Sequence, residues 1–241
     1  MSRFHRIISA LAGVLLCACS TNHQMTANSS STVAIDTTVN GLNIYYPQFS
    51  RIDLVCGTMP SKKDKDIVFC AEAAFTHALL DAFAHTNIDG DHVSGGTRYS
   101  GAQCKDNSGA FAYYKGAWQF VRGDYSAMLD SAAQGGGMGF GQALIIYNGE
   151  SIRPLWRGGV NEYRALCEKD GRLCIVDSDK AVPYDEFVAL LEAFAPRYAL
   201  YMDMGAGWNH SWYRDASGTA HEIHPPAPKS KYCTNWITFY K

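Results

Sequence analysis

The sequence carries little charge, and neither sign dominates it. Charged side chains make up 18% of the 241 residues, and the formal net charge at pH 7 is -2. Because a protein that binds a nucleic-acid backbone needs a surplus of lysine and arginine, we expect no nucleic-acid partner. Zinc-finger spacings of cysteine and histidine are absent, as is any Cys-x-x-Cys motif, so no metal site is expected and no cofactor is indicated.

Long apolar runs are also absent, since the hydrophobic stretch at residues 7–16 is too short to cross a bilayer as a helix. It follows a segment with two arginines and leads into LCAC, which ends at Cys19 and resembles the lipobox of bacterial lipoproteins. The pattern predicts a lipoprotein signal peptide over residues 1–18 and lipidation of Cys19. The lipid would anchor the protein to a membrane of the bacterial cell envelope, which we expect to be the outer membrane, facing the periplasm. An ordinary signal peptide that releases a soluble protein is the alternative.

The segment after the lipobox lacks apolar periodicity. Residues 19–40 are rich in serine, threonine and asparagine, a composition typical of a flexible tether. We therefore expect one folded domain over residues 41–241.

Short alternating runs predict that this domain is built largely from hairpins. Three two-residue turns, Lys115-Gly116, Asn148-Gly149 and Asp170-Gly171, separate such runs, and helical periodicity appears at residues 74–84, 125–133 and 184–194. The expected class is α+β, with a mainly antiparallel or mixed sheet and a few packed helices in a single domain. The predicted strands are residues 42–46, 51–55, 67–71, 110–114, 117–121, 143–147, 163–167, 173–176, 198–203 and 235–241.

Six cysteines remain after the signal peptide and the lipidation site are set aside. The turn at Asp170-Gly171 places Cys167 opposite Cys174, and export to an oxidising compartment makes this pair the candidate disulfide. The register makes them a hydrogen-bonded pair, which suits a cross-strand bridge less well. A free buried pair is the alternative.

Two carboxylates stand in apolar surroundings. Glu72 lies within IVFCAEAAFTHALL, where it either caps a helix or lines a cleft as an acid, base or nucleophile. Asp203 ends a strand-like run and is followed by Gly205 and Gly207, whose backbones could approach a ligand closely; a turn in which Asp203 bonds its own backbone is the alternative. Two histidines, His92 and His210, lie in polar loops that contain or adjoin glycine, as expected of ligand-contacting imidazoles.

Several segments share their order and spacing with one known family. They are AEAAFT, GQALIIYNGE, YRALCEKDGRLCIV, the helix at residues 184–194 and ALYMDMGAGWN. Over residues 41–241 the sequence resembles the phosphodiester glycosidase domain family, which includes the catalytic domain of the lysosomal uncovering enzyme and a branch of bacterial lipoproteins. The resemblance implies an envelope hydrolase that cleaves a sugar from a sugar phosphodiester, and hence a carbohydrate or sugar-phosphate substrate.

The family motifs also imply roles for particular residues. Arg164 and Asp203 match them, whereas Glu72 stands where the family has asparagine, and one glycine and a serine that follow the aspartate are replaced. The resemblance implies that Glu72 and Asp203 are the catalytic carboxylates and that Arg164 is the phosphate clamp. A non-catalytic glycan-binding lipoprotein of the same fold is the alternative. The expected substrate-binding residues are His92, Gly205, Gly207, Trp208, Asn209 and His210, and the expected sugar-stacking aromatics are Trp208, Trp212 and Tyr213.

Overall fold

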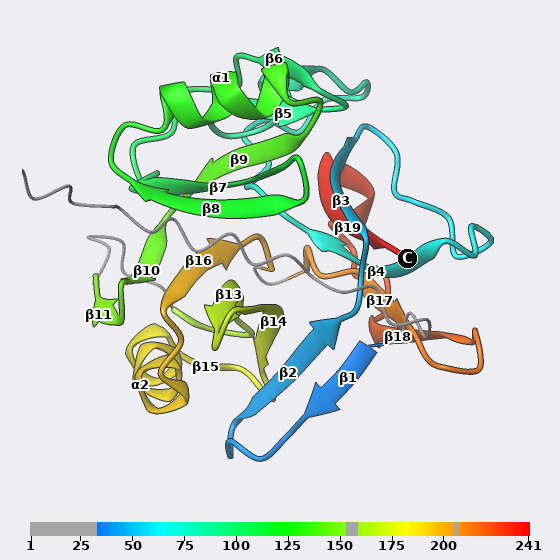
Figure 1. Cartoon of the computed structure of the whole chain (residues 1–241). Helices are drawn as coiled ribbons and strands as arrows, with labels where there is room; N and C mark the ends of the chain where they lie inside the picture. Colours follow the sequence, from blue (N-terminus) through cyan, green and yellow to red (C-terminus); the bar gives the residue numbers. More distant parts are fainter. Residues whose placement is uncertain (1–32, 153–158, 205–206) are drawn as a thin grey trace, which may run out of the picture.

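Antiparallel strands make up most of the regular structure (Figure 1). The computed structural model describes residues 33–152, 159–204 and 207–241. The predicted signal peptide and the lipidation site at Cys19 lie outside these ranges, as do most of the tether and Gly205.

The largest sheet has seven strands in the order β1-β2-β14-β13-β16-β10-β11. Every pairing in it is antiparallel. Its strands are β1 (Val33–Asp36), β2 (Leu42–Pro47), β14 (Arg172–Ser178), β13 (Arg164–Lys169), β16 (Tyr198–Met202), β10 (Leu144–Tyr147) and β11 (Glu150–Ser151).

The described residues also form two five-stranded sheets and one short ribbon. The second sheet has the order β18 (Ala220–His224), β17 (Ser211–Arg214), β4 (Ile67–Glu72), β19 (Asn235–Tyr240) and β3 (Arg51–Cys56). The third has the order β6 (Thr97–Tyr99), β5 (His92–Ser94), β9 (Met138–Gln142), β7 (Gly109–Tyr114) and β8 (Ala117–Arg122). The ribbon pairs β12 (Val160–Asn161) with β15 (Val182–Pro183).

The expected α+β class is wrong. Within the described ranges there are two α-helices, α1 (Ser126–Gln134) and α2 (Tyr184–Phe194), and two 3₁₀ turns, η1 (His85–Asn87) and η2 (Ser230–Tyr232), against four antiparallel sheets. The chain is therefore β-rich. No helix in the described part of the chain is long and apolar enough to span a membrane.

The predicted helix over residues 74–84 is the main reason for the error. The side chain of Asn235 binds the backbone of Ala74 on both sides, accepting from its N–H at 2.8 Å and donating to its carbonyl at 2.9 Å. Farther along, the N–H of His77 donates to the carbonyl of Asn87 at 2.7 Å. Because these backbone groups are bonded across the chain, they are not available for helical bonds, and two leucines of the predicted apolar face, Leu79 and Leu80, are each 54% exposed.

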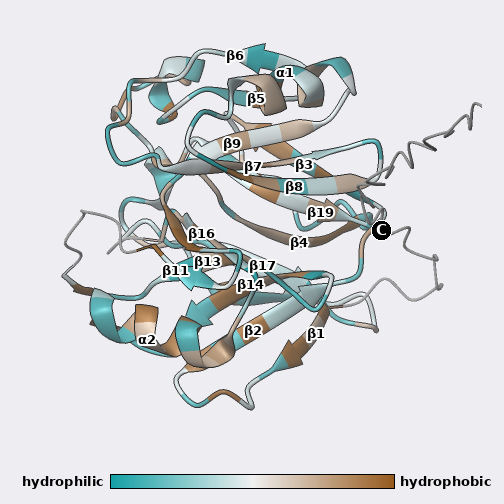
Figure 2. Cartoon of the chain, turned by 60° about the vertical axis from the view of Figure 1, so that its left-hand side comes forward, coloured by the Kyte–Doolittle hydropathy of each residue, from teal (hydrophilic) through white to brown (hydrophobic). Residues whose placement is uncertain are grey.

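The main core is shared by the three large sheets. It includes Leu166 and Leu200 of the seven-stranded sheet, Phe69 of the second and Phe111 of the third. The other face of the seven-stranded sheet packs against α2, and α1 covers the third sheet, so the helices lie at opposite ends of the stack (Figure 2). A sheet buried on both faces explains why its strands read as continuous apolar runs.

The hairpin at β13 and β14 confirms the predicted register. Cys167 lies directly opposite Cys174, and the turn residue Asp170 has the positive φ of 52° that a two-residue turn of this kind requires. Both thiols are buried and free, so no disulfide joins the pair, and the other cysteines in the described ranges are free as well. The free buried pair, which was the alternative, is what the structure contains.

Candidate functional site

Three predicted site residues come together where strand ends of two sheets meet. Glu72 is the last residue of β4 in the second sheet, while Arg164 begins β13 and Asp203 directly follows β16 in the seven-stranded sheet. Arg164 pairs with Met202, the neighbour of Asp203. The backbone N–H of Asp203 donates to the carbonyl of Ala73 at 2.9 Å, which ties the two sheets together beside Glu72. Register and sheet packing therefore bring these three residues to one place.

Arg164 is fully buried, and other groups of the protein already hold most of its guanidinium. Its Nε and Nη2 atoms donate to the two carboxylate oxygens of Asp177, each at 2.7 Å, and Nη2 also donates to the hydroxyl of Ser211 at 2.8 Å. A bidentate pair of this kind fixes the plane of the guanidinium. The expected role as a free phosphate clamp therefore applies at most to the remaining nitrogen, Nη1.

The remaining nitrogen faces Glu72. Arg164 Nη1 lies 3.6 Å from Glu72 Oε2, which is beyond hydrogen-bond distance, and neither atom has a hydrogen-bond partner among the described residues. Buried polar atoms are nearly always bonded, so two such atoms side by side mark the place where a ligand oxygen or a water molecule would complete the bonding.

The carboxyl group of Glu72 is held in its neutral form. Burial raises its pKa to about 8, the charge of Arg164 opposes this rise, and the negative charge of Asp203 adds to it. The backbone N–H of His210 bonds the same carboxyl group. Glu72 is 1% exposed and Asp203 is 6% exposed, so the two groups share an environment that water barely reaches. A proton donor beside an aspartate is a pairing that acid–base chemistry uses.

Asp177 has the opposite character. Burial would raise its pKa, but the charge and hydrogen bonds of Arg164 and the contact with His224 outweigh burial and hold it below its ordinary value. His224 Nε2 lies 3.2 Å from Asp177 Oδ2. One guanidinium thus faces an ionised carboxylate on one side and a neutral carboxyl group on the other.

The predicted substrate-binding segment reaches Glu72 through its backbone, at His210 directly and at Trp208 through Cys233. Asn209 donates to Glu162 at 2.8 Å, and the carbonyl of Trp208 accepts from the thiol of Cys233, whose sulfur also lies 3.9 Å from Glu72 Oε1. His210 Nε2 lies 3.6 Å from a carboxylate oxygen of Glu222. The backbone N–H of His210 and the thiol of Cys233 thus contact the Glu72 carboxyl group, whereas the side chains of Asn209 and His210 face other carboxylates.

The predicted glycine Gly207 and the predicted aromatic residues differ from one another in burial and in contacts. Gly207 has a positive φ of 84°, and its carbonyl accepts from the N–H of Lys229 at 2.7 Å. Trp212 is fully buried on the outer face of the second sheet, so it is unable to stack against a sugar as expected. Trp208 and Tyr213 are half-buried.

His92 belongs to a different group of side chains. It is fully buried on β5, and its ring contacts His85 and Tyr99 rather than the cluster at Glu72. A surface depression of about 300 Å³ is separate from both groups, and none of the predicted site residues lines it. Its lining includes Arg51, Asp53 and Lys115, together with Gly136 and Gly137.

Sequence reasoning missed the partners that hold Arg164. The signal for Asp177 was present, because the register that pairs Cys167 with Cys174 also pairs Arg164 with Asp177. Ser211 and His224 lie on β17 and β18, and no sequence pattern connects those strands to β13.

Comparison with known proteins gives a likeness of fold only. No family model matches the sequence, and no curated protein matches it. A matching structure is the catalytic domain of zebrafish N-acetylglucosamine-1-phosphodiester alpha-N-acetylglucosaminidase, auto-inhibited by its pro-peptide, with a TM-score of 0.59 and 10% identity over 87% of this chain and 81% of that chain. A hypothetical protein from Synechocystis has a TM-score of 0.49 and 12% identity, over 87% of this chain and 61% of that chain. The fold is therefore similar to that of a phosphodiester glycosidase domain.

Proposed function

We propose that the protein is an envelope lipoprotein hydrolase that cleaves a sugar from a sugar phosphodiester or a related glycan. The observation that carries the proposal is the meeting of Glu72, Arg164 and Asp203 at one junction of strand ends. The similarity of fold to a phosphodiester glycosidase catalytic domain supports the same chemistry. The lipobox-like LCAC supports attachment through Cys19 to an envelope membrane.

The reaction adds water at the anomeric carbon and breaks the bond from that carbon to the phosphate oxygen, which leaves a free sugar and a phosphate monoester. Glu72 is protonated at neutral pH and can give its proton to the departing oxygen. Asp203 accepts a proton from the attacking water, or it attacks the anomeric carbon itself and forms a glycosyl ester. In the second case water hydrolyses the ester, and Glu72, which has given up its proton, takes one back from that water.

Arg164 acts as a positioning residue in this scheme. Asp177 and Ser211 fix its guanidinium, so that Nη1 points toward Glu72 with no bond of its own among the described residues. A substrate oxygen that accepts from Nη1 would lie beside the Glu72 carboxyl group, where the proton is needed.

A non-catalytic glycan-binding role is the second candidate. Burial favours it over catalysis at these residues, because Glu72, Arg164 and Asp203 are 1%, 0% and 6% exposed and a binding protein could hold its glycan through other side chains. A catalytic centre must admit its substrate, whereas a buried charge cluster can serve the fold alone.

Hydrolysis of a sugar 1-phosphodiester with a chromogenic aglycone tests the proposal. We expect turnover by the full chain and a loss of about 100-fold or more in kcat for Asp203→Asn, the lower bound of what a general acid or base contributes. Glu192→Gln is the matched control, because Glu192 is exposed on α2. Saturable binding of the phosphodiester without turnover would favour the binding protein, and unchanged activity of Asp203→Asn would refute the assignment of the carboxylates.

A further inference from the structure

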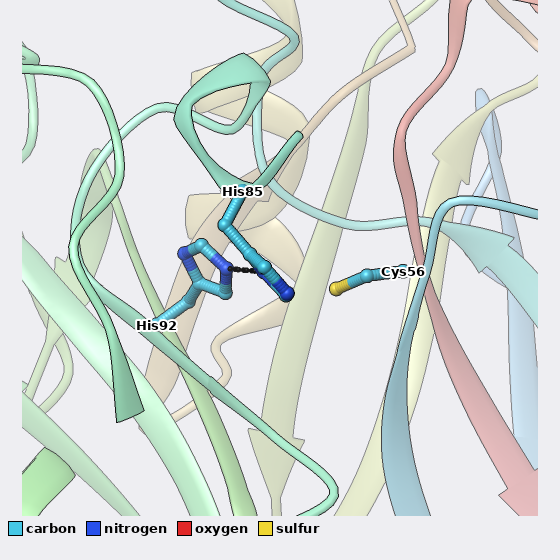
Figure 3. Close-up of side chains that lie close together, drawn as sticks. All are labelled: Cys56, His85 and His92. Atoms are coloured by element: carbon cyan, nitrogen blue, oxygen red, sulfur yellow. Dashed lines mark hydrogen bonds between the residues drawn. The ribbon is translucent and has the colours of Figure 1, made fainter. Parts of the chain in front are cut away.

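A second cluster of reactive side chains lies apart from the carboxylates. Cys56 ends β3, His85 begins η1 and His92 begins β5, and Figure 3 shows the two imidazoles side by side with the ring of His85 toward the sulfur of Cys56. One donor atom from each of the three residues lies within 4.8 Å of the others. The cluster includes none of Glu72, Arg164 and Asp203, and His92 is the one member that the sequence had placed in the substrate-binding set.

The position of one lone pair follows from a hydrogen bond. His92 Nδ1 lies 3.1 Å from the carbonyl oxygen of Gly90. Because a carbonyl only accepts, Nδ1 carries a proton, and His92 Nε2 presents a lone pair when the ring is neutral. This nitrogen lies 2.9 Å from His85 Nδ1. A histidine whose far nitrogen donates to a backbone carbonyl is the usual form of a metal ligand with outer-shell support.

The surrounding chain fixes His85 in place. Asn87 is buried, and its side chain accepts from the N–H of Ala84 at 2.6 Å and donates to the carbonyl of Ala78 at 2.8 Å, which closes the turn that carries His85. The ring of Tyr99 stacks on His85 with centroids 3.3 Å apart and planes 7° apart. The imidazole is therefore preorganised, although its residue is only half-buried.

The protonation states of the two imidazoles and of the thiol suit the binding of a metal cation that prefers nitrogen and sulfur ligands. Burial lowers the pKa of both His85 and His92, which favours neutral rings. In this state His92 Nε2 accepts a hydrogen bond from His85 Nδ1, and a metal ion would take the place of that bond. Burial raises the pKa of Cys56 to about 11, against a hydrogen bond from Ser94 that lowers it. Without a metal the thiol keeps its proton, and a coordinated metal would displace that proton.

We propose that Cys56, His85 and His92 bind one Zn²⁺ ion, with a fourth position open to solvent beside the half-buried Cys56 and His85. Thiolate and imidazole are the ligands that zinc prefers, and three protein ligands with an open position are typical of zinc sites that bind water or a small ligand. Ideal bond lengths of about 2.0 Å to nitrogen and about 2.3 Å to sulfur bring tetrahedral donor atoms to roughly 3.3–3.6 Å from one another. Donor atoms that lie up to 4.8 Å apart would therefore move closer together by roughly 1 Å when the ion binds.

Binding releases one proton for each ion. The thiol of Cys56 loses its proton and forms the bond to zinc, while a proton on the coordinating nitrogen of His85 moves to the other nitrogen of the same ring. The net charge of the site then rises by one, from a neutral cluster to one cation that carries one thiolate.

Titration of the full chain with Co²⁺ and Zn²⁺ under reducing conditions tests the site. We expect one Co²⁺ per chain, with an intense thiolate-to-cobalt charge-transfer band in the near ultraviolet that Zn²⁺ abolishes, and release of one proton per Zn²⁺. Cys56→Ser should remove the band. His85→Ala should weaken Zn²⁺ binding by more than the roughly 10–100-fold that outer-shell residues contribute.

Matched controls separate this site from other thiols and imidazoles. Cys104→Ser removes a half-buried cysteine and His77→Gln an exposed histidine, neither of which belongs to the cluster, so both should keep the band and the stoichiometry. Circular dichroism verifies that each variant is folded, and if His85→Ala is not, Cys56→Ser decides the outcome alone. A chain that shows no charge-transfer band, or a band that persists in Cys56→Ser, would overturn the proposal.

Discussion

Replacement of Glu72 by glutamine tests the balance of charge around Arg164. The guanidinium carries one positive charge, and Asp177 already binds it through two hydrogen bonds of 2.7 Å. Arg164 is therefore unable to compensate a second carboxylate in full, and burial raises the pKa of Glu72 from its ordinary value of 4.5 to about 8. Glutamine has nearly the same shape as a protonated glutamate and does not titrate.

The sign of the effect follows from proton binding. Between about pH 4.5 and pH 8 the folded chain keeps the Glu72 proton and the unfolded chain releases it, so the contribution of Glu72 to the free energy of unfolding falls as the pH rises. It is fully present below the ordinary pKa and is lost once the pH reaches the folded value. At roughly 1.4 kcal/mol per pH unit, the full interval corresponds to on the order of 5 kcal/mol.

Denaturant unfolding between pH 5 and pH 9, in the presence of a reductant for the free thiols, measures this effect. Relative to Glu72→Gln, the wild-type chain should lose stability steadily up to about pH 8 and no further above it. Glu192→Gln removes an exposed carboxylate and should follow the wild-type curve. Parallel curves for the wild type and Glu72→Gln over this range would mean that Arg164 keeps Glu72 ionised, and the reasoning would be refuted.

Three further outcomes are expected. Asp177→Asn leaves the charge of Arg164 buried without its main partner and should lower the free energy of unfolding by about 3–5 kcal/mol, and a loss below 1 kcal/mol would contradict the buried pairing. Asn235→Ala removes both bonds to the backbone of Ala74 and should cost about 1–3 kcal/mol in denaturant unfolding, with faster amide exchange at Ala74. Cys19→Ala should release the protein from membranes on fractionation, whereas continued membrane pelleting would argue against lipidation.

Local signals predicted the hairpins well. The turn at Asp170-Gly171 determined the register of β13 and β14, and Pro183 and Pro196 mark the two ends of the helix that became α2. In both cases the information lies within about a dozen residues, so no distant contact is needed to interpret it.

Distant contacts decided what the sequence could not predict. Residues 74–84 have helical periodicity, yet the side chain of Asn235 on β19 takes both backbone groups of Ala74 and holds the chain extended. The cluster of Cys56, His85 and His92 likewise comes from three separate elements, so its spacing along the chain resembles no metal motif. Only the packing of elements that are distant along the chain brings such residues together.

The central strands of the seven-stranded sheet are buried on both faces, and this has a consequence for how they align. In a sheet with one solvent-exposed face, a register shift of one residue turns hydrophobic side chains toward water. Here the shift would move them from one buried face to the other, at little cost in hydrophobic free energy. A slip in the β13–β14 hairpin would, however, remove Arg164 from Asp177 and turn its charge toward the apolar layer beneath α2. The buried ion pair therefore helps to specify the register of these strands. It makes a shifted pairing costly in free energy, although hydrophobic burial alone would tolerate the shift.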